Sequence, residues 1–113
     1  MSDQTTILAE LTEVLEQRKH ESAEDSYVAS LYASGINKIL EKVGEETTEV
    51  IIAAKEAAAD ATKQGELVKE IADLWFHTMV LLASQDMHTN QVLSELARRF
   101  GIGGHDEKAS RGH

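Results

Sequence analysis

The chain has 113 residues, of which 42% are hydrophobic and 27% charged, a size and composition typical of a single globular domain. Cysteine is absent, which excludes disulfides and thiolate metal sites, and the formal net charge of −9 disfavours nucleic acid as a partner. No apolar run is long enough to cross a membrane, and the first 20 residues lack the basic start and apolar core of a signal peptide, so we expect a cytoplasmic protein.

The composition favours helices, because proline is absent and alanine, leucine and glutamate are plentiful. Apolar residues at intervals of three and four predict a first amphipathic helix over about 4–19. A short helix should follow, with Ser26 as its cap and Gly35 ending or bending it. The next helix keeps the same spacing over about 36–61, for about seven turns.

The stretch "KQGE" at 63–66, with Gly65 at the turn, is expected to separate this helix from another over about 66–85. That helix is apolar nearly all round and must be buried on most sides. A last helix begins near residue 89 or 90 and stops at Gly101, and 101–113 form a glycine-rich tail predicted to be flexible. Four or five helices are too few to surround this apolar helix. The sequence therefore predicts an all-α bundle of four to five helices in one domain, completed by homodimerisation.

Two acidic pairs stand out on adjacent helices. Glu46 and Glu49 lie one turn apart at the edge of the apolar stripe of helix 36–61, an arrangement that by itself is typical of a solvated surface. Glu70 and Asp73 have the same spacing but mostly apolar neighbours, where an unpaired carboxylate is costly. The short connection indicates antiparallel helices, so both pairs can meet at one level.

Four carboxylates at one level would need compensation, which divalent cations can supply. An oxygen-rich cluster with little histidine suits Mg²⁺, with Mn²⁺ as a possible substitute, rather than zinc. His77 lies one turn beyond Asp73 and is more typical of a hydrogen-bonded core residue than of a metal ligand. We expect it to orient the carboxylate of Glu70 or Asp73.

The pattern EExxE followed by ExxD resembles the all-α nucleoside triphosphate pyrophosphatase superfamily. The segments "SYVASLYASGINKILEKVGEETTEVIIAAK", "EIADLWFHTMVLL" and "GGHDEKASR" are similar to its phosphoribosyl-ATP pyrophosphatase family of histidine biosynthesis. The resemblance runs from Leu8 to about Arg111. Two departures lie near the motif, Glu41 where many relatives have lysine and Thr47 where alanine is frequent, and neither touches the acidic set.

The resemblance implies Mg²⁺-dependent hydrolysis of phosphoribosyl-ATP to phosphoribosyl-AMP and pyrophosphate, with cleavage between the α- and β-phosphates. It also implies a helical homodimer whose sites lie at or near the subunit interface. Matched residue by residue, the family's acidic set falls on Glu45, Glu46, Glu49, Glu70 and Asp73.

Roles for these residues follow from the chemistry of phosphoanhydride hydrolysis, which requires charge neutralisation and a positioned water. Metal ligation is expected from Glu46, Glu49, Glu70 and Asp73. Glu45 or Glu46 is the candidate to orient or deprotonate the water. The candidates for substrate binding are basic side chains: Lys38 and Lys42 first, then Lys55 and Arg98, and finally Lys108 and Arg111. Each of them could instead be an ordinary solvated side chain. The tail that carries Lys108 and Arg111 could close over the substrate as a lid.

Two other functions are compatible with the sequence. The first is a housecleaning pyrophosphatase that acts on other nucleoside triphosphates, the broader activity of the superfamily. The second is a non-catalytic helical dimerisation module, for which the acidic pairs would be ordinary surface charges.

Overall fold

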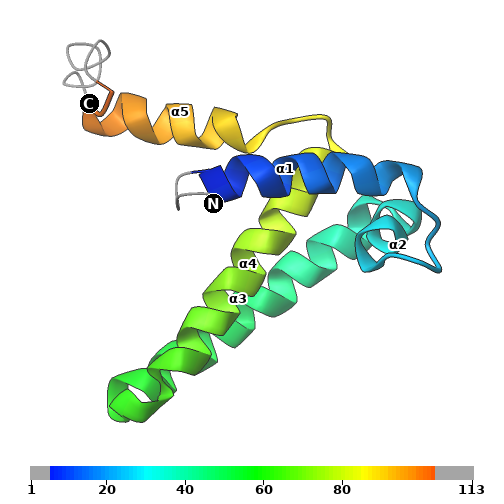
Figure 1. Ribbon diagram of the computed structural model, residues 1–113. Coiled ribbons are helices and arrows are strands. Elements are labelled where there is room, and N and C mark those ends of the chain that lie inside the picture. The colour runs from blue at the N-terminus through cyan, green and yellow to red at the C-terminus, as the bar shows by residue number, and fades with distance from the viewer. Residues whose placement is uncertain (1–5, 104–113) are drawn as a thin grey trace.

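A computed structural model describes residues 6–103 and places all of its regular elements in helices, which confirms the all-α prediction for this part of the chain. Two 3₁₀ turns, η2 and η3, interrupt the path after α1 and after α3 (Figure 1). The elements in chain order are α1 (Ile7–Gln17), η2 (Arg18–His20), α2 (Tyr27–Ser34), α3 (Ile36–Ala59), η3 (Ala61–Lys63), α4 (Gln64–Ser84) and α5 (Thr89–Phe100).

Side-chain caps and glycines determine the helix boundaries near α2 and α5. The hydroxyl of Ser26 accepts a hydrogen bond from the amide of Ala29 at 3.2 Å, as expected of an N-cap. Gly35 has a φ of 97°, a conformation that side chains rarely tolerate, and it ends α2 directly before α3 begins. Gly101 ends α5 in the left-handed region with a φ of 64°.

The break between α3 and α4 is earlier than the sequence analysis predicted. The connection is centred on Asp60, which has extended backbone and whose carboxylate accepts from the amide and the hydroxyl of Thr62 at 3.0 and 2.7 Å. Such a side chain offers the backbone an alternative to the helix and ends it. The prediction that Gly65 lies at the turn is wrong, because this glycine is already inside the first turn of α4.

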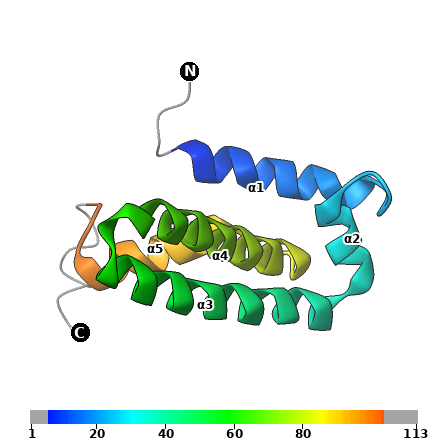
Figure 2. The ribbon, with the colours of Figure 1, turned by 90° about the horizontal axis from the view of Figure 1, so that it is seen from below.

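Helices α3 and α4 form a long antiparallel hairpin, and α1 and α2 pack across one of its ends (Figures 1 and 2). The buried core lies at this covered end, where α1, α2, the start of α3 and the last turns of α4 meet. Its most deeply buried large side chains are Leu15, Ile39 and Val80, each at most 1% exposed. Among residues 6–103, no further helix packs closely on the hairpin beyond the core.

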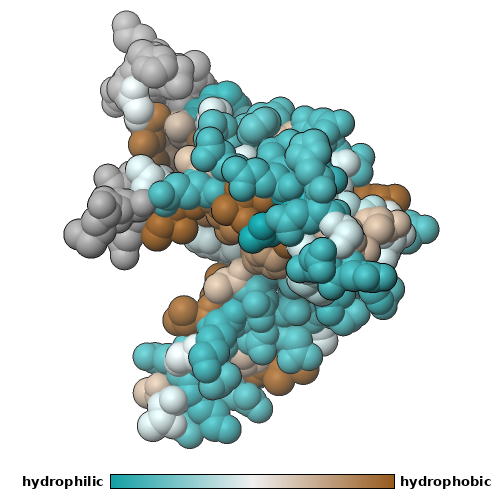
Figure 3. Space-filling view, turned by 45° about the vertical axis from the view of Figure 1, so that its right-hand side comes forward, coloured by the Kyte–Doolittle hydropathy of each residue, from teal (hydrophilic) through white to brown (hydrophobic). Residues whose placement is uncertain are grey.

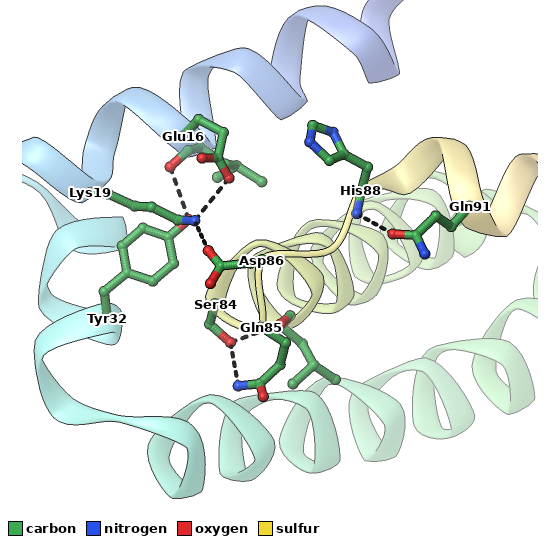
Figure 4. A network of polar contacts seen from close by, with 10 residues as sticks. Glu16, Lys19, Tyr32, Ser84, Gln85, Asp86, His88 and Gln91 are labelled. Atoms are coloured by element: carbon green, nitrogen blue, oxygen red, sulfur yellow. Dashed lines mark hydrogen bonds and ion pairs between the residues drawn. The ribbon is translucent and has the colours of Figure 1, made fainter.

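A network of charged residues joins α1 to the turn between α4 and α5 (Figure 4). The Lys19 ammonium lies 3.0 Å from a carboxylate oxygen of Glu16 and 3.0 Å from one of Asp86. Burial alone would lower the pKa of Lys19, but the hydrogen bonds to both carboxylates outweigh it, and its pKa is raised. Asp86 has a φ of 57°, so the network holds a non-glycine residue in a left-handed conformation.

Large apolar side chains remain exposed along the hairpin and on α5. They gather partly at the notch between the α1–α5 layer and the hairpin (Figure 3), where an apolar groove of about 310 Å³ is lined by residues of α1, α4 and α5. Val68 and Trp75 on α4 are 67% and 59% exposed, so the described part of the chain does not by itself bury α4 on most sides. No helix within residues 6–103 is long and apolar enough to span a bilayer.

Candidate active site

Three carboxylates from two helices converge on the face of the hairpin. Glu46 comes from α3, and Glu70 and Asp73 come from α4, one turn apart. One oxygen atom from each side chain can be chosen so that all three lie within 4.8 Å of one another. Glu46 and Glu70 are half-buried and Asp73 is exposed, so the group is open to solvent on one side. The antiparallel hairpin brings the two acidic motifs to the same level, as their spacing predicted.

The electrostatics of this cluster leave negative charge uncompensated. The Oε2 atom of Glu46 is buried and has no hydrogen-bond partner within the described residues. Burial raises the pKa of Glu70, and repulsion from Glu46, Glu49 and Asp73 raises it further. A buried carboxylate oxygen without a donor is unfavourable, and a hard cation bound by oxygen atoms would satisfy it. The donor set therefore fits Mg²⁺ or Mn²⁺.

Glu45 and Glu49 lie beside the cluster rather than within its most compact part. Together with Glu46, Thr48 and Glu70 they line a cavity of about 470 Å³ on the hairpin face. Glu49 is exposed and sufficiently close to Glu70 to raise its pKa. The cavity places a space for ligand next to the carboxylates, and its wall is predominantly acidic.

Lysine side chains on α3 have carboxylate partners one turn away. Lys42 donates to Glu45 at 3.2 Å, and this hydrogen bond is the main reason that its pKa is raised. Electrostatic attraction to Glu45 and Glu46 adds to the effect. Its partner Glu45 lines the cavity beside the cluster, so Lys42 is joined to the wall of the acidic site. Lys38 donates to Glu41 at 3.5 Å, further from the cluster along the helix.

The other predicted cations are not gathered at the cluster. Lys55 is exposed on α3, nearly two turns beyond Glu49. Arg98 on α5 forms a bidentate ion pair with Glu95 at 3.0 and 2.7 Å and lines a separate cavity on that helix. Lys108, Arg111 and the proposed lid of the tail lie outside the described residues.

His77 is buried, at 5% exposure, and contacts the site through the main chain. Its Nδ1 lies 2.8 Å from the carbonyl oxygen of Asp73, and its Nε2 lies 2.9 Å from the hydroxyl of Tyr27. The carboxylate predicted as the partner of His77 is not its partner, and the ring instead contacts the main chain of Asp73 and the hydroxyl of Tyr27. Fifty positions separate Tyr27 from His77, so no local pattern reveals their contact.

Residues 8–100 match the family model described as phosphoribosyl-ATP pyrophosphohydrolase. The matched segment spans most of the chain and includes all of α3 and α4, with the three converging carboxylates. The match confirms the resemblance drawn from the motifs and favours this activity over both alternatives. The chain therefore belongs to the phosphoribosyl-ATP pyrophosphohydrolase family, the hydrolases that act on phosphoribosyl-ATP in histidine biosynthesis.

Proposed function

We propose that the acidic face of the α3–α4 hairpin is the active site, and that it uses Mg²⁺ to hydrolyse phosphoribosyl-ATP between the α- and β-phosphates. The observation that carries this proposal is the approach of Glu46, Glu70 and Asp73 within 4.8 Å, with one buried Glu46 oxygen unpartnered among the described residues. The adjacent cavity provides space for the triphosphate.

Glu46, Glu70 and Asp73 would hold Mg²⁺, with Glu49 as a further ligand from the rim of the cavity. When bound, the ion would neutralise charge on the phosphates and favour departure of pyrophosphate. Glu46 is one of the three converging carboxylates and has a buried oxygen without a hydrogen-bond partner among the described residues, so we assign it to ligation first.

Glu45 is our candidate to orient and deprotonate the attacking water. It lines the cavity, is exposed, and has a carboxylate fixed by the ammonium of Lys42. Lys42 is correspondingly our first candidate to contact the triphosphate, because its ammonium pairs with Glu45 on the wall of the cavity. We place Lys38 and Lys55 at the periphery of substrate binding.

We further propose that residues 1–113 form one domain that works as a homodimer. Support comes from the exposed apolar side chains of the hairpin and α5, including Ile51, Val68, Trp75 and Phe100, each at least 59% exposed. Burial of such surface is the main favourable term in association. A substrate-binding role for Arg98, which this fold keeps apart from the acidic cluster, would require the second subunit.

The test is pyrophosphate release from phosphoribosyl-ATP, measured with Mg²⁺, with Mn²⁺ and in EDTA. We expect release with either metal, none in EDTA, and loss of activity in Glu46→Gln and Asp73→Asn. Glu56→Gln is the matched control, since it removes an exposed carboxylate from the same hairpin outside the cluster. Comparable turnover of a panel of dNTPs would contradict the substrate assignment, and metal-independent release would contradict the site.

A further inference from the structure

A chain of two hydrogen bonds joins the first residue of α2 to the main chain of a cluster residue on α4. The hydroxyl of Tyr27 lies 2.9 Å from Nε2 of His77, and Nδ1 of the same ring lies 2.8 Å from the carbonyl oxygen of Asp73. His77 is 5% exposed, so both ring nitrogens have their partners within the protein. The buried imidazole therefore connects a helix outside the hairpin to a residue whose carboxylate belongs to the acidic cluster.

The chemistry of the three groups fixes the direction of both hydrogen bonds. A carbonyl oxygen only accepts, so Nδ1 of His77 carries the proton that it donates to Asp73. In the neutral imidazole Nε2 is then an acceptor, and the hydroxyl of Tyr27 is the donor. Because the hydrogen bond at one ring nitrogen determines which nitrogen is protonated, Tyr27 selects the tautomer that can donate to Asp73.

Aromatic packing holds the imidazole between its two partners. The ring of Phe76 meets His77 edge-on with centroids 5.0 Å apart, and the ring of Tyr27 meets it edge-on at 5.9 Å. Phe76 also stacks on Tyr27 at 6.4 Å and packs against the buried core. The core therefore helps to fix the positions of both rings that form the hydrogen-bonded chain.

The hydrogen bond from His77 matters for the carboxylate of Asp73 because an aspartate side chain is short. Its carboxylate turns about only two torsions, so the position of the main chain limits where the carboxylate can lie. The ring closes the turn 73–77 in addition to the regular hydrogen bonds of α4. Asp73 and Trp75 in this turn are exposed, so packing holds this side of the turn only weakly. The chain through His77 thus ties the main chain at Asp73 to α2.

We propose that Tyr27 and His77 are positioning residues for the cation site: Tyr27 selects the tautomer of His77, and Nδ1 of His77 holds the main chain so that the carboxylate of Asp73 stays within the cluster. This inference rests on the proposed role of the cluster in binding Mg²⁺. A merely structural role, in which Tyr27 joins α2 to α4, would change the stability of the fold and leave the Mg²⁺ affinity of the folded protein unchanged.

Tyr32 supplies a matched control on the same helix. Its hydroxyl donates to the carbonyl of Leu15 at 2.9 Å, and it lies beside Lys19 in a different cavity (Figure 4). Tyr27→Phe and Tyr32→Phe each remove one hydroxyl and one hydrogen bond between α2 and another helix. We expect the two variants to lose thermal stability in EDTA to a similar extent.

Isothermal titration calorimetry of the metal-free protein with Mg²⁺ separates the two roles. We expect Tyr27→Phe to raise the Kd for Mg²⁺ about tenfold, the lower end of the effect of mutating residues that hydrogen-bond to metal ligands, because this contact acts through the main chain. Tyr32→Phe should leave the Kd unchanged. Equal Kd values in the two tyrosine variants would overturn the inference.

Substitutions of His77 test whether Tyr27 acts through the ring. His77→Asn keeps a side-chain N–H for the carbonyl of Asp73, whereas His77→Leu, of similar size, keeps none, so the asparagine variant should bind Mg²⁺ more tightly. In the His77→Leu background Tyr27→Phe should add little to the Kd. A full tenfold effect of Tyr27→Phe in that background would overturn the proposed path from Tyr27 through His77 to Asp73.

Nitrogen-15 NMR of the metal-free protein tests the tautomer directly. The wild type should show His77 protonated at Nδ1 and unprotonated at Nε2, and Tyr27→Phe should place the proton on Nε2 in part of the molecules. A wild-type proton on Nε2 would overturn the chain of hydrogen bonds. A wild type that neither binds Mg²⁺ nor releases pyrophosphate would overturn the proposed function as well, whereas an active, Mg²⁺-binding wild type with an unchanged Kd in Tyr27→Phe overturns this inference alone.

Discussion

Replacement of Asp73 by asparagine should have opposite effects on stability without and with Mg²⁺. Asp73 and Glu46 have oxygen atoms within 4.8 Å. Two unit charges at that distance repel by about 0.9 kcal/mol in water and about 3.5 kcal/mol at an effective dielectric constant of 20. Asp73 is exposed, so the value near water applies and Asp73→Asn should gain about 1 kcal/mol in EDTA. For a domain of this size, that raises Tm by about 4 °C.

Saturating Mg²⁺ should reverse this order. Mg²⁺ at 100 times its Kd stabilises the wild type by about 2.7 kcal/mol, or about 10 °C in Tm. Loss of a carboxylate ligand should weaken Mg²⁺ binding by about a hundredfold, the upper end of the effect of mutating residues that hydrogen-bond to metal ligands. At the same Mg²⁺ concentration, the ion then stabilises Asp73→Asn by only about 0.4 kcal/mol. The wild type should therefore melt higher than the variant in Mg²⁺ and lower in EDTA.

The assay is thermal unfolding followed by circular dichroism in matched buffers containing EDTA or Mg²⁺. Glu56→Gln controls for the change in net charge and should shift with Mg²⁺ as the wild type does. A wild-type Tm that Mg²⁺ does not change would refute the cation site. An Asp73→Asn variant less stable than the wild type in EDTA would show that the carboxylates do not repel one another as their distance requires.

Three other changes test interactions that stabilise the fold. Hydrogen bonds from Arg98 and Arg99 lower the pKa of Glu95 to about 2. The ionised Glu95 side chain therefore stabilises the fold fully above pH 4.5, and this stabilisation is lost as the pH falls toward about 2. Urea unfolding at several pH values should show that the wild type is more stable than Glu95→Gln above pH 4.5 and loses this difference toward about pH 2. Asp86→Ala should cost about 1–2 kcal/mol in urea unfolding, since alanine strains the left-handed backbone and cannot pair with Lys19, whereas Asp86→Asn should cost less than 1 kcal/mol. Gly44→Ala should stabilise the metal-free chain by about 0.5–1 kcal/mol in the same assay, because alanine is favoured over glycine inside a helix and no atom lies within 4 Å of the added Cβ. A lower stability in this variant would indicate that another molecule approaches the helix closely at this position.

Local features of the fold could be predicted from the sequence because their causes are local. The cap at Ser26 and the glycine stop at Gly35 depend on a few adjacent residues. The convergence of the two acidic motifs depends only on helical periodicity and a short connection. The connection itself was misplaced, because Asp60 ends α3 through its own hydrogen bonds, and helix propensity did not weigh that competition.

Features that depend on packing between distant segments could not be predicted. The contact of Tyr27 with His77 joins residues 50 positions apart, and only the folded chain shows that α2 lies against α4 at that level. The separation of Arg98 from the acidic cluster likewise depends on the path of α5. Sequence periodicity places a residue on a face of its helix but does not specify which element covers that face.

The position of the site along the hairpin connects its chemistry to its stability. The core anchors α3 and α4 at one end, around Ile39 and Val80, whereas the carboxylates lie where coverage by α1 and α2 gives way to exposed side chains such as Trp75. Repulsion among the carboxylates therefore acts on a part of the hairpin that few other elements hold together. A bound cation and the proposed second subunit would stabilise this same part, so each should strengthen the other's binding. Mg²⁺ should accordingly shift any monomer–dimer equilibrium toward the dimer in analytical ultracentrifugation, and Asp73→Asn should weaken that shift.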